Sequence, residues 1–256
     1  MYCKIFHCTS NYNFLILFLN MNPTSSPNLK FFNMPHFLRT KHIRNTYRQF
    51  LETNFQGLRL RKPLFYSWPV GLRFDLQTEP FYTEECFKEV NHRASTLFQT
   101  AFEQNDEILV VLSEHAKKKG KIRTGNFIFK QIQNLNYKEI FYLKEKELYH
   151  PNDKNDQYNF AVIPTSITQI NFKTILESIA NIDHPTRRPR FDNYKCLPTK
   201  EIYLLNLNKK VIFNMYDDRG LDIIGADKEI IHSIFKKHNE WILEFDRERI
   251  EKQFTV

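Results

Sequence analysis

The chain has 256 residues, a formal net charge of +8 and 15% aromatic residues. This length can bury a sizeable core, and 41% hydrophobic residues indicate a folded protein rather than a disordered one. Only 6 glycines are present, which disfavours a glycine-rich cofactor loop.

The positive charge is concentrated near the N-terminus. No acidic residue precedes Glu52, whereas the rest of the chain carries 31 of the 37 basic side chains and all 29 acidic ones. A nucleic-acid-binding domain would have a larger basic surplus than this nearly balanced body, so nucleic acid is an unlikely partner. The four cysteines form no C-x-x-C pair, which favours a reducing, cytoplasmic compartment.

Residues 1–33 differ from the body in pattern. Their apolar run, residues 14–19, is too short to span a bilayer, and no membrane partner is expected. We expect a disordered tail or an extension from a start codon assigned too early, with Met21 or Met34 as the alternative to Met1. An organellar transit peptide is the other interpretation of this basic composition.

The body shows both helical and strand periodicity. Apolar positions that repeat every three to four residues predict amphipathic helices at 36–55, 83–104, 171–182 and 227–247. Alternating or short apolar runs predict strands at 70–76, 108–112, 127–132, 140–149, 158–163, 202–205, 211–216 and 221–224. The apolar stripe of the last helix includes Phe245, and that helix can divide near Asn239.

These elements predict an α+β fold. The sheet is expected to be mostly antiparallel, with a C-terminal β-meander, and to be packed by three or four helices. Residues 34–256 are expected to form one domain. Subdivision near 184–198 is the alternative, because a proline-containing connector at residues 184–190 could join two small units.

The best candidates for chemistry lie in a turn and the strand after it, namely Asp217, Asp218, Arg219, Gly220 and Asp222. Three carboxylates at a strand end can hold a hard cation such as Mg²⁺. A structural interpretation is simpler, because Asp favours turns, Gly220 can supply a positive φ and Arg219 neutralises carboxylate charge. We favour the structural interpretation, and no metal or other cofactor is predicted.

The second candidate is a contact surface that comprises Trp68, Arg73, Arg187, Arg188 and Arg190. The last three lie between or beside the two prolines of the connector, and fixed guanidinium groups can bind phosphate or an acidic partner. An ordinary connecting loop is the alternative, because polar segments bounded by prolines commonly join elements.

The sequence lacks the motifs of several common catalytic sites. Its nine histidines include no H-E-x-x-H, and there is no G-x-S-x-G. The basic stretch at 117–125 lacks the residue order of a P-loop and is expected to be a solvated loop. Cys86 lies in the first turn of a predicted helix, where a small buried apolar role is the simplest interpretation.

Several segments resemble one family. They include Phe-Tyr-Ser-Trp and Gly-Leu-Arg-Phe within residues 64–76 and Asn-Met-Tyr-Asp-Asp-Arg-Gly at 214–220, and further matches at 89–102, 170–180 and 239–247. From about residue 40 the chain resembles an uncharacterised family of low-GC, Bacillus-type Gram-positive bacteria, classed as a domain of unknown function. The resemblance implies a small cytoplasmic α+β protein without an assigned activity, and residues 1–33 lie outside it.

The sequence therefore favours a cytoplasmic, non-enzymatic protein-interaction module with a protein partner. An antitoxin or immunity protein is an example that rests on analogy alone. One alternative is a metal-dependent hydrolase or phosphoryl-transfer enzyme that uses the three aspartates of the turn. The other is a nucleic-acid-binding protein that uses the three arginines of the connector.

Overall fold

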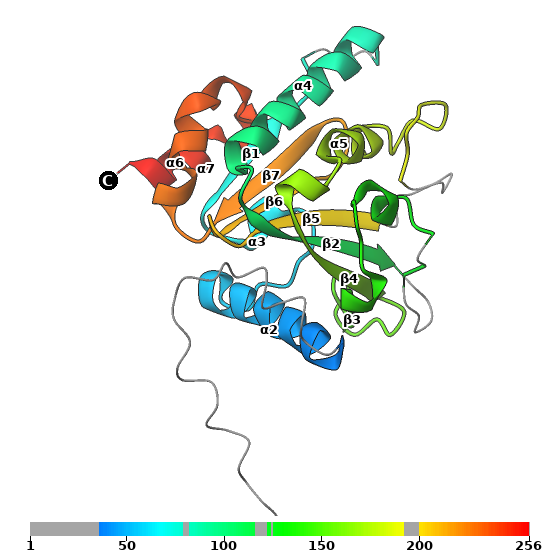
Figure 1. Cartoon of the computed structure of the whole chain (residues 1–256). Coiled ribbons are helices and arrows are strands. Elements are labelled where there is room, and N and C mark those ends of the chain that lie inside the picture. Colours follow the sequence, from blue (N-terminus) through cyan, green and yellow to red (C-terminus); the bar gives the residue numbers. More distant parts are fainter. Residues whose placement is uncertain (1–35, 79–81, 116–121, 124, 192–199, 256) are drawn as a thin grey trace, which may run out of the picture. The chain divides into compact units, whose positions relative to one another are not determined.

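The computed structural model describes residues 36–78, 82–115, 122–123, 125–191 and 200–255 (Figure 1). The predicted extension at residues 1–33, with its alternative start sites, lies outside the described residues. So do most of the basic stretch at 117–125 and residues 192–198 of the predicted subdivision at 184–198. The described residues belong to one compact unit, His36–Val256.

The strands of the described residues form one antiparallel sheet. Their order is β1 (Gly71–Asp75), β7 (Gly220–Gly225), β6 (Val211–Met215), β5 (Lys200–Asn206), β2 (Glu107–His115), β4 (Gln157–Ser166) and β3 (Phe141–Lys146). Every neighbouring pair is antiparallel, and β5, β6 and β7 follow one another as a meander. The predicted α+β class and C-terminal meander are therefore confirmed.

The α-helices are α2 (His36–Phe55), α3 (Leu64–Ser67), α4 (Glu84–Ala101), α5 (Phe172–Ala180), α6 (Lys228–Lys237) and α7 (Arg247–Phe254). Short 3-10 helices are η1 (Ile128–Gln131), η2 (Tyr137–Glu139), η3 (Ile167–Gln169), η4 (Asn239–Trp241) and η5 (Glu244–Asp246). Side-chain caps begin three of the α-helices: Thr83 accepts from the Cys86 backbone N–H at 3.1 Å, Asn171 from that of Thr174 at 3.5 Å, and Asp227 from that of Ile230 at 3.1 Å.

Two sequence predictions of secondary structure were wrong. The strand predicted at 127–132 is mostly the 3-10 helix η1, because the Asn126 side chain accepts a hydrogen bond from the Ile128 backbone N–H and starts a turn. The helix predicted at 227–247 ends at Lys237, and the two short helices η4 and η5 separate it from α7. The predicted division near Asn239 is confirmed.

One face of the sheet, which we call the α4 face, is covered by α4, α5 and α6 (Figure 1). Alternate residues of every inner strand point into this core, including Phe213 of β6 and Ile223 of β7. Phe98 of α4 stacks on Phe172 of α5 with ring centroids 4.4 Å apart and meets the edge of Phe213 at 5.7 Å. The α4 face is therefore the main apolar core.

The opposite face, which we call the α2 face, carries α2 (Figure 1). The buried side of α2 includes Tyr47 and Phe55, and the ring of Tyr47 lies 6.5 Å from that of Phe141 in β3. Strand alternation also places polar residues on this face, because they neighbour the apolar residues that fill the α4 face. They include Arg73 of β1 and Asp222 of β7, which pair directly across the two strands.

Candidate functional site

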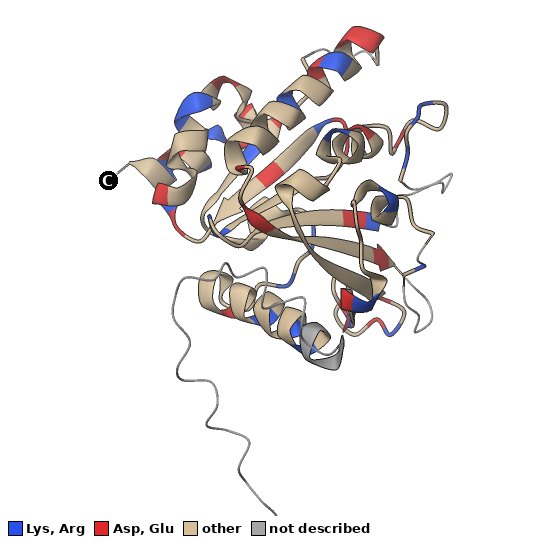
Figure 2. Cartoon of the chain, viewed as in Figure 1, with Lys and Arg blue, Asp and Glu red and all other residues tan. Residues whose placement is uncertain are grey.

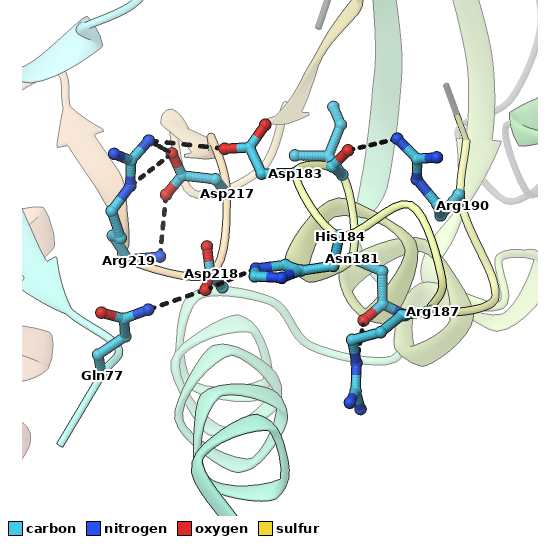
Figure 3. Close-up of polar contacts among 10 residues, drawn as sticks. Gln77, Asn181, Asp183, His184, Arg187, Arg190, Asp217, Asp218 and Arg219 are labelled. Carbon is cyan, nitrogen blue, oxygen red and sulfur yellow. Dashed lines mark hydrogen bonds and ion pairs between the residues drawn. The ribbon is translucent and has the colours of Figure 1, made fainter. Parts of the chain in front are cut away.

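The turn between β6 and β7 holds Asp217 and Arg219 together. Asp217 accepts a hydrogen bond from the backbone N–H of Arg219 at 2.9 Å and from its Nε at 2.9 Å (Figure 3). The Arg219 guanidinium also lies 3.7 Å from Asp183, in the turn between α5 and the connector. This local pairing raises the pKa of Arg219, chiefly through its hydrogen bond to Asp217. The turn is therefore closed by its own charged pair.

Gly220 is required because a side chain would not fit there. The positive φ that the sequence analysis predicted for Gly220 is wrong. Gly57 is the glycine with positive φ among the described residues. A Cβ at position 220 would lie 2.7 Å from the Phe74 carbonyl oxygen and would also overlap the Tyr216 hydroxyl. The close approach of β1 to β7 therefore requires glycine here.

Asp218 points away from Asp217 and contacts a histidine of the connector. Its Oδ2 accepts from Gln77 Nε2 at 2.8 Å and lies 3.2 Å from His184 Nε2 (Figure 3). The imidazole packs edge-on against Phe87 of α4 with the ring centroids 4.8 Å apart. Asp218 therefore ties the turn to the connector and to the start of α4, a link that sequence patterns did not predict.

Asp222 lies apart from the other two aspartates, on the α2 face. Its Oδ2 accepts from the Phe65 backbone N–H at 3.0 Å, and its Oδ1 lies 3.5 Å from Arg73 Nε. Asp217, Asp218 and Asp222 thus point to separate partners. Within the part of the chain that the structure describes, no group of three His, Cys, Asp or Glu residues could hold a metal ion.

Around Asp222 the structure assembles a set of side chains that we call the Arg73 network: Tyr66, Arg73, Tyr216, Asp222 and Asp246. The two carboxylates are buried, whereas the ring of Tyr66 is exposed. The Arg73 Nε and Nη2 each lie 3.4 Å from the Tyr216 hydroxyl, and Nη1 lies 3.7 Å from Asp246 Oδ2. The Tyr66 hydroxyl donates to Asp246 at 2.9 Å. One guanidinium therefore serves two carboxylates from β7 and η5.

Burial alters the acid–base properties of the Arg73 network. Desolvation raises the pKa of Asp222 to about 6, although the Phe65 N–H and the Arg73 charge oppose that rise. Burial, followed by the nearby Asp222 charge, raises the pKa of Tyr216 to about 12. Sequence analysis named Arg73 and Asp222 but missed Tyr66, Tyr216 and Asp246, because nothing local in the sequence indicates which distant strands and turns become neighbours.

A second buried carboxylate on the α2 face belongs to Glu201 of β5. The Tyr149 hydroxyl donates to its Oε1 at 2.7 Å, and the Tyr203 hydroxyl donates to its Oε2 at 2.5 Å. Burial and the Glu201 charge raise the pKa values of both tyrosines. Glu201 is therefore satisfied by neutral donors, whereas Asp222 has a cation beside it.

The three connector arginines bind their own chain. Arg187 pairs with Glu84 of α4, with one of its two contacts at 3.1 Å. Arg188 and Arg190 donate to backbone carbonyl oxygens within residues 182–187, the former at 2.7 Å and the latter at 2.6 Å. These guanidinium groups therefore help to hold the connector in place, and Arg188, which donates through Nη1, remains exposed.

Trp68 and Arg73 do not form the exposed contact surface that the sequence suggested. Trp68 is only 8% exposed, and its Nε1 donates to the Gly225 carbonyl oxygen at 2.8 Å. The Arg73 side chain is 14% exposed and is held in the network described above. The amphipathic indole and the guanidinium thus stabilise the contact of α3 and β1 with β7.

Other aromatic side chains are exposed, and one of them, Tyr66, lies against Arg73. Phe245 of η5 is 85% exposed, and Tyr66, whose hydroxyl binds the adjacent Asp246, is 44% exposed. The Arg249 guanidinium of α7 lies 5.2 Å from the centroid of the Tyr66 ring. Sequence analysis placed Phe245 in a buried helical stripe. The prediction was wrong because the helix ends before this residue and η5 turns its side chain outwards.

No helix among the described residues has the length and apolar character needed to cross a membrane. Together, the antiparallel sheet, its two differently covered faces and the Arg73 network define an α+β protein.

The chain belongs to the family described as a domain of unknown function, DUF3885, whose model matches residues 47–246. It is 26% identical over 214 residues to the uncharacterized protein YnaE of Bacillus subtilis (strain 168), across 77% of this chain and 96% of that protein. No solved structure matches the chain. The resemblance inferred from the sequence is thereby confirmed.

Proposed function

We propose that this chain is a non-enzymatic protein-interaction module and that Phe245 anchors its contact with a folded protein partner. The observation that carries the proposal is the 85% exposure of this large apolar side chain on an ordered turn. Isolated exposed apolar residues are common on proteins, so exposure alone is insufficient. The support comes from how the turn is held and from the residues beside it.

The turn that carries Phe245 is fixed at both sides. The Leu243 backbone N–H donates to the Arg73 carbonyl oxygen at 2.9 Å, which attaches the turn to β1. On the other side, the buried Asp246 carboxylate binds Tyr66 and faces Arg73. Because these contacts already hold the backbone of the turn, binding has to order little beyond the Phe245 side chain, which favours recognition.

The surroundings of Phe245 also have the composition of an interaction centre. Tyr66 and Arg249 lie beside the turn, and aromatic residues and arginine are enriched among the side chains that dominate binding energies. A partner with an apolar pocket would bury Phe245 there. The antitoxin or immunity role is a narrower form of this proposal and rests on analogy alone.

The test is site-specific photocrosslinking followed by a binding measurement with purified proteins. A benzophenone amino acid replaces Phe245 in the full chain, and Tyr137, which is 45% exposed on η2, is replaced in the control. One protein should crosslink at position 245 and not at position 137. Its purified form should then bind Phe245→Ala about 30-fold more weakly than wild type, as expected for an anchor residue. Equal binding, or a crosslink only between two copies of the chain, would refute the proposal.

A further inference from the structure

The outward face of α2 carries a stripe of basic side chains. Lys41, Arg44 and Arg48 are all exposed, and their spacing of three and four residues places them in one row along the helix. Figure 2 shows these cations as blue segments along α2. We call these three residues the α2 stripe. They lie far in sequence from the connector arginines that the sequence had suggested for a partner.

The charged ends of the α2 stripe have no partner within the described part of the chain. No ion pair, side-chain hydrogen bond or ring contact there involves Lys41, Arg44 or Arg48, in contrast with Arg187 of the connector, which pairs with Glu84. Like charges that share one helix row also repel one another. The stripe is therefore a concentration of positive charge that the described fold does not neutralise.

The fold anchors the helix that carries the α2 stripe. On the inward side of the helix Ile43, Tyr47 and Phe55 are buried, and Phe55 meets the edge of the Trp68 ring at 5.3 Å. Thr40 at the start of the stripe donates to the Lys138 carbonyl oxygen at 3.2 Å. Because the apolar side of α2 already packs against the sheet, it is not available for insertion into a lipid surface.

We propose that the α2 stripe docks an acidic helix of a protein partner. Lys41 and Arg48 are seven residues apart, so the stripe spans about 10 Å of helix axis. Carboxylates spaced at i, i+3 and i+7 on a partner helix match this row. The row continues to the exposed Glu52, which a basic residue one turn further along the partner would meet. The inference rests on the proposed function being protein interaction.

Two features favour an acidic helix over nucleic acid. Glu52 places a negative charge in line with the three cations, where it would repel a continuous phosphate backbone. The aromatic side chains of α2 from Thr40 onwards, including Tyr47 and Phe50, are buried and cannot stack on bases. A partner helix of mixed charge accommodates both the cations and Glu52.

The test compares two variants of the full chain with equal loss of charge. Lys41→Gln/Arg44→Gln/Arg48→Gln removes the α2 stripe, and Lys130→Gln/Lys236→Gln/Lys237→Gln removes three exposed lysines elsewhere. The main probe is a synthetic helical peptide with Glu at i, i+3 and i+7 and Lys at i+11. The other probes are a single-stranded DNA oligonucleotide and phosphatidylglycerol vesicles. Circular dichroism checks that both variants remain folded.

The peptide should bind wild type and the control variant alike, and the stripe variant about tenfold more weakly, as expected for three exposed ion pairs. The difference should shrink as salt screens the charges. Equal loss in both variants, or tighter binding of the oligonucleotide or vesicles than of the peptide, would overturn the inference. Phe245→Ala should leave peptide binding unchanged, so failure of the Phe245 proposal and failure of the stripe are distinguishable.

Discussion

The two faces of the sheet differ in how they tolerate charge. The α4 face is filled mainly by apolar side chains such as Phe98 and Phe213, and its buried carboxylate, Asp106, lies at the rim beyond α4, where Asn206 donates to it. The α2 face contains the carboxylates of Asp222 and Glu201, each nearly inaccessible to solvent. Successive residues of one strand point to opposite faces, so they alternate between apolar packing and polar contacts. The α4 face supplies most of the apolar stabilisation, whereas the α2 face couples stability to ionisation and holds the turn that presents Phe245.

The largest expected effect is on the α4 face. Phe213→Ala should lower the free energy of unfolding by about 4 kcal/mol, because it removes a buried ring that contacts Phe98 and Phe102. Urea denaturation measures the change, and Phe245→Ala is the matched control because Phe245 is 85% exposed. If both substitutions destabilise equally, the assignment of Phe245 to the surface is wrong.

The next effect tests the Arg73 network. Arg73→Met should lower the free energy of unfolding by about 3 kcal/mol at pH 7, because Asp222 and Asp246 lose their shared buried cation. At pH 5 the loss should be smaller, since Asp222, whose pKa is raised to about 6, is then mostly protonated and needs the cation less. Equal losses at the two pH values would show that Arg73 acts through packing alone.

Glu201 offers a milder test of the α2 face. Tyr203→Phe should lower the free energy of unfolding by about 1.5 kcal/mol, because one oxygen of a buried carboxylate loses its hydrogen-bond donor. The hydroxyl of Tyr149 still satisfies the other oxygen. Thermal unfolding of the variant, beside Tyr137→Phe as a control on an exposed ring, measures the difference. An unchanged melting temperature would contradict the hydrogen bond.

The smallest expected effect is a pH dependence with a defined sign. Burial raises the pKa of Asp222 from 3.8 to about 6, so between these values the folded state binds more protons than the unfolded state. The contribution of Asp222 to stability is therefore full below pH 3.8 and is lost as the pH rises through 6. Relative to Asp222→Asn, wild type should gain about 1 kcal/mol between pH 7 and pH 5. A parallel pH profile of the two proteins would rule out titration at Asp222.

Local patterns predicted the elements but not their partners. The bounds of α2 and the meander followed from periodicity. In an amphipathic helix or an alternating strand, the spacing of apolar residues shows directly which side of the element is buried. The same alternation marked Arg73 as polar within β1 without showing that Asp222 and Asp246 would surround it. Phe245 and Trp68 were misplaced for a related reason, since burial depends on where the chain turns. These turns depend on local hydrogen bonds that hydrophobicity does not reveal.

The pairing of β1 with β7 has a consequence for how the chain is made. β1 leaves the ribosome early, yet its neighbour in the sheet is the last strand synthesised, and the Phe74 backbone also bridges to Ile242. Until the C-terminal residues emerge, β1 has no strand to pair with, and contacts so distant in sequence form slowly. A chain cut short before Gly220 would expose the edge of β6 and its apolar residues to aggregation. Synthesis through β7 and on to Ile242 is thus the step that gives β1 its partners.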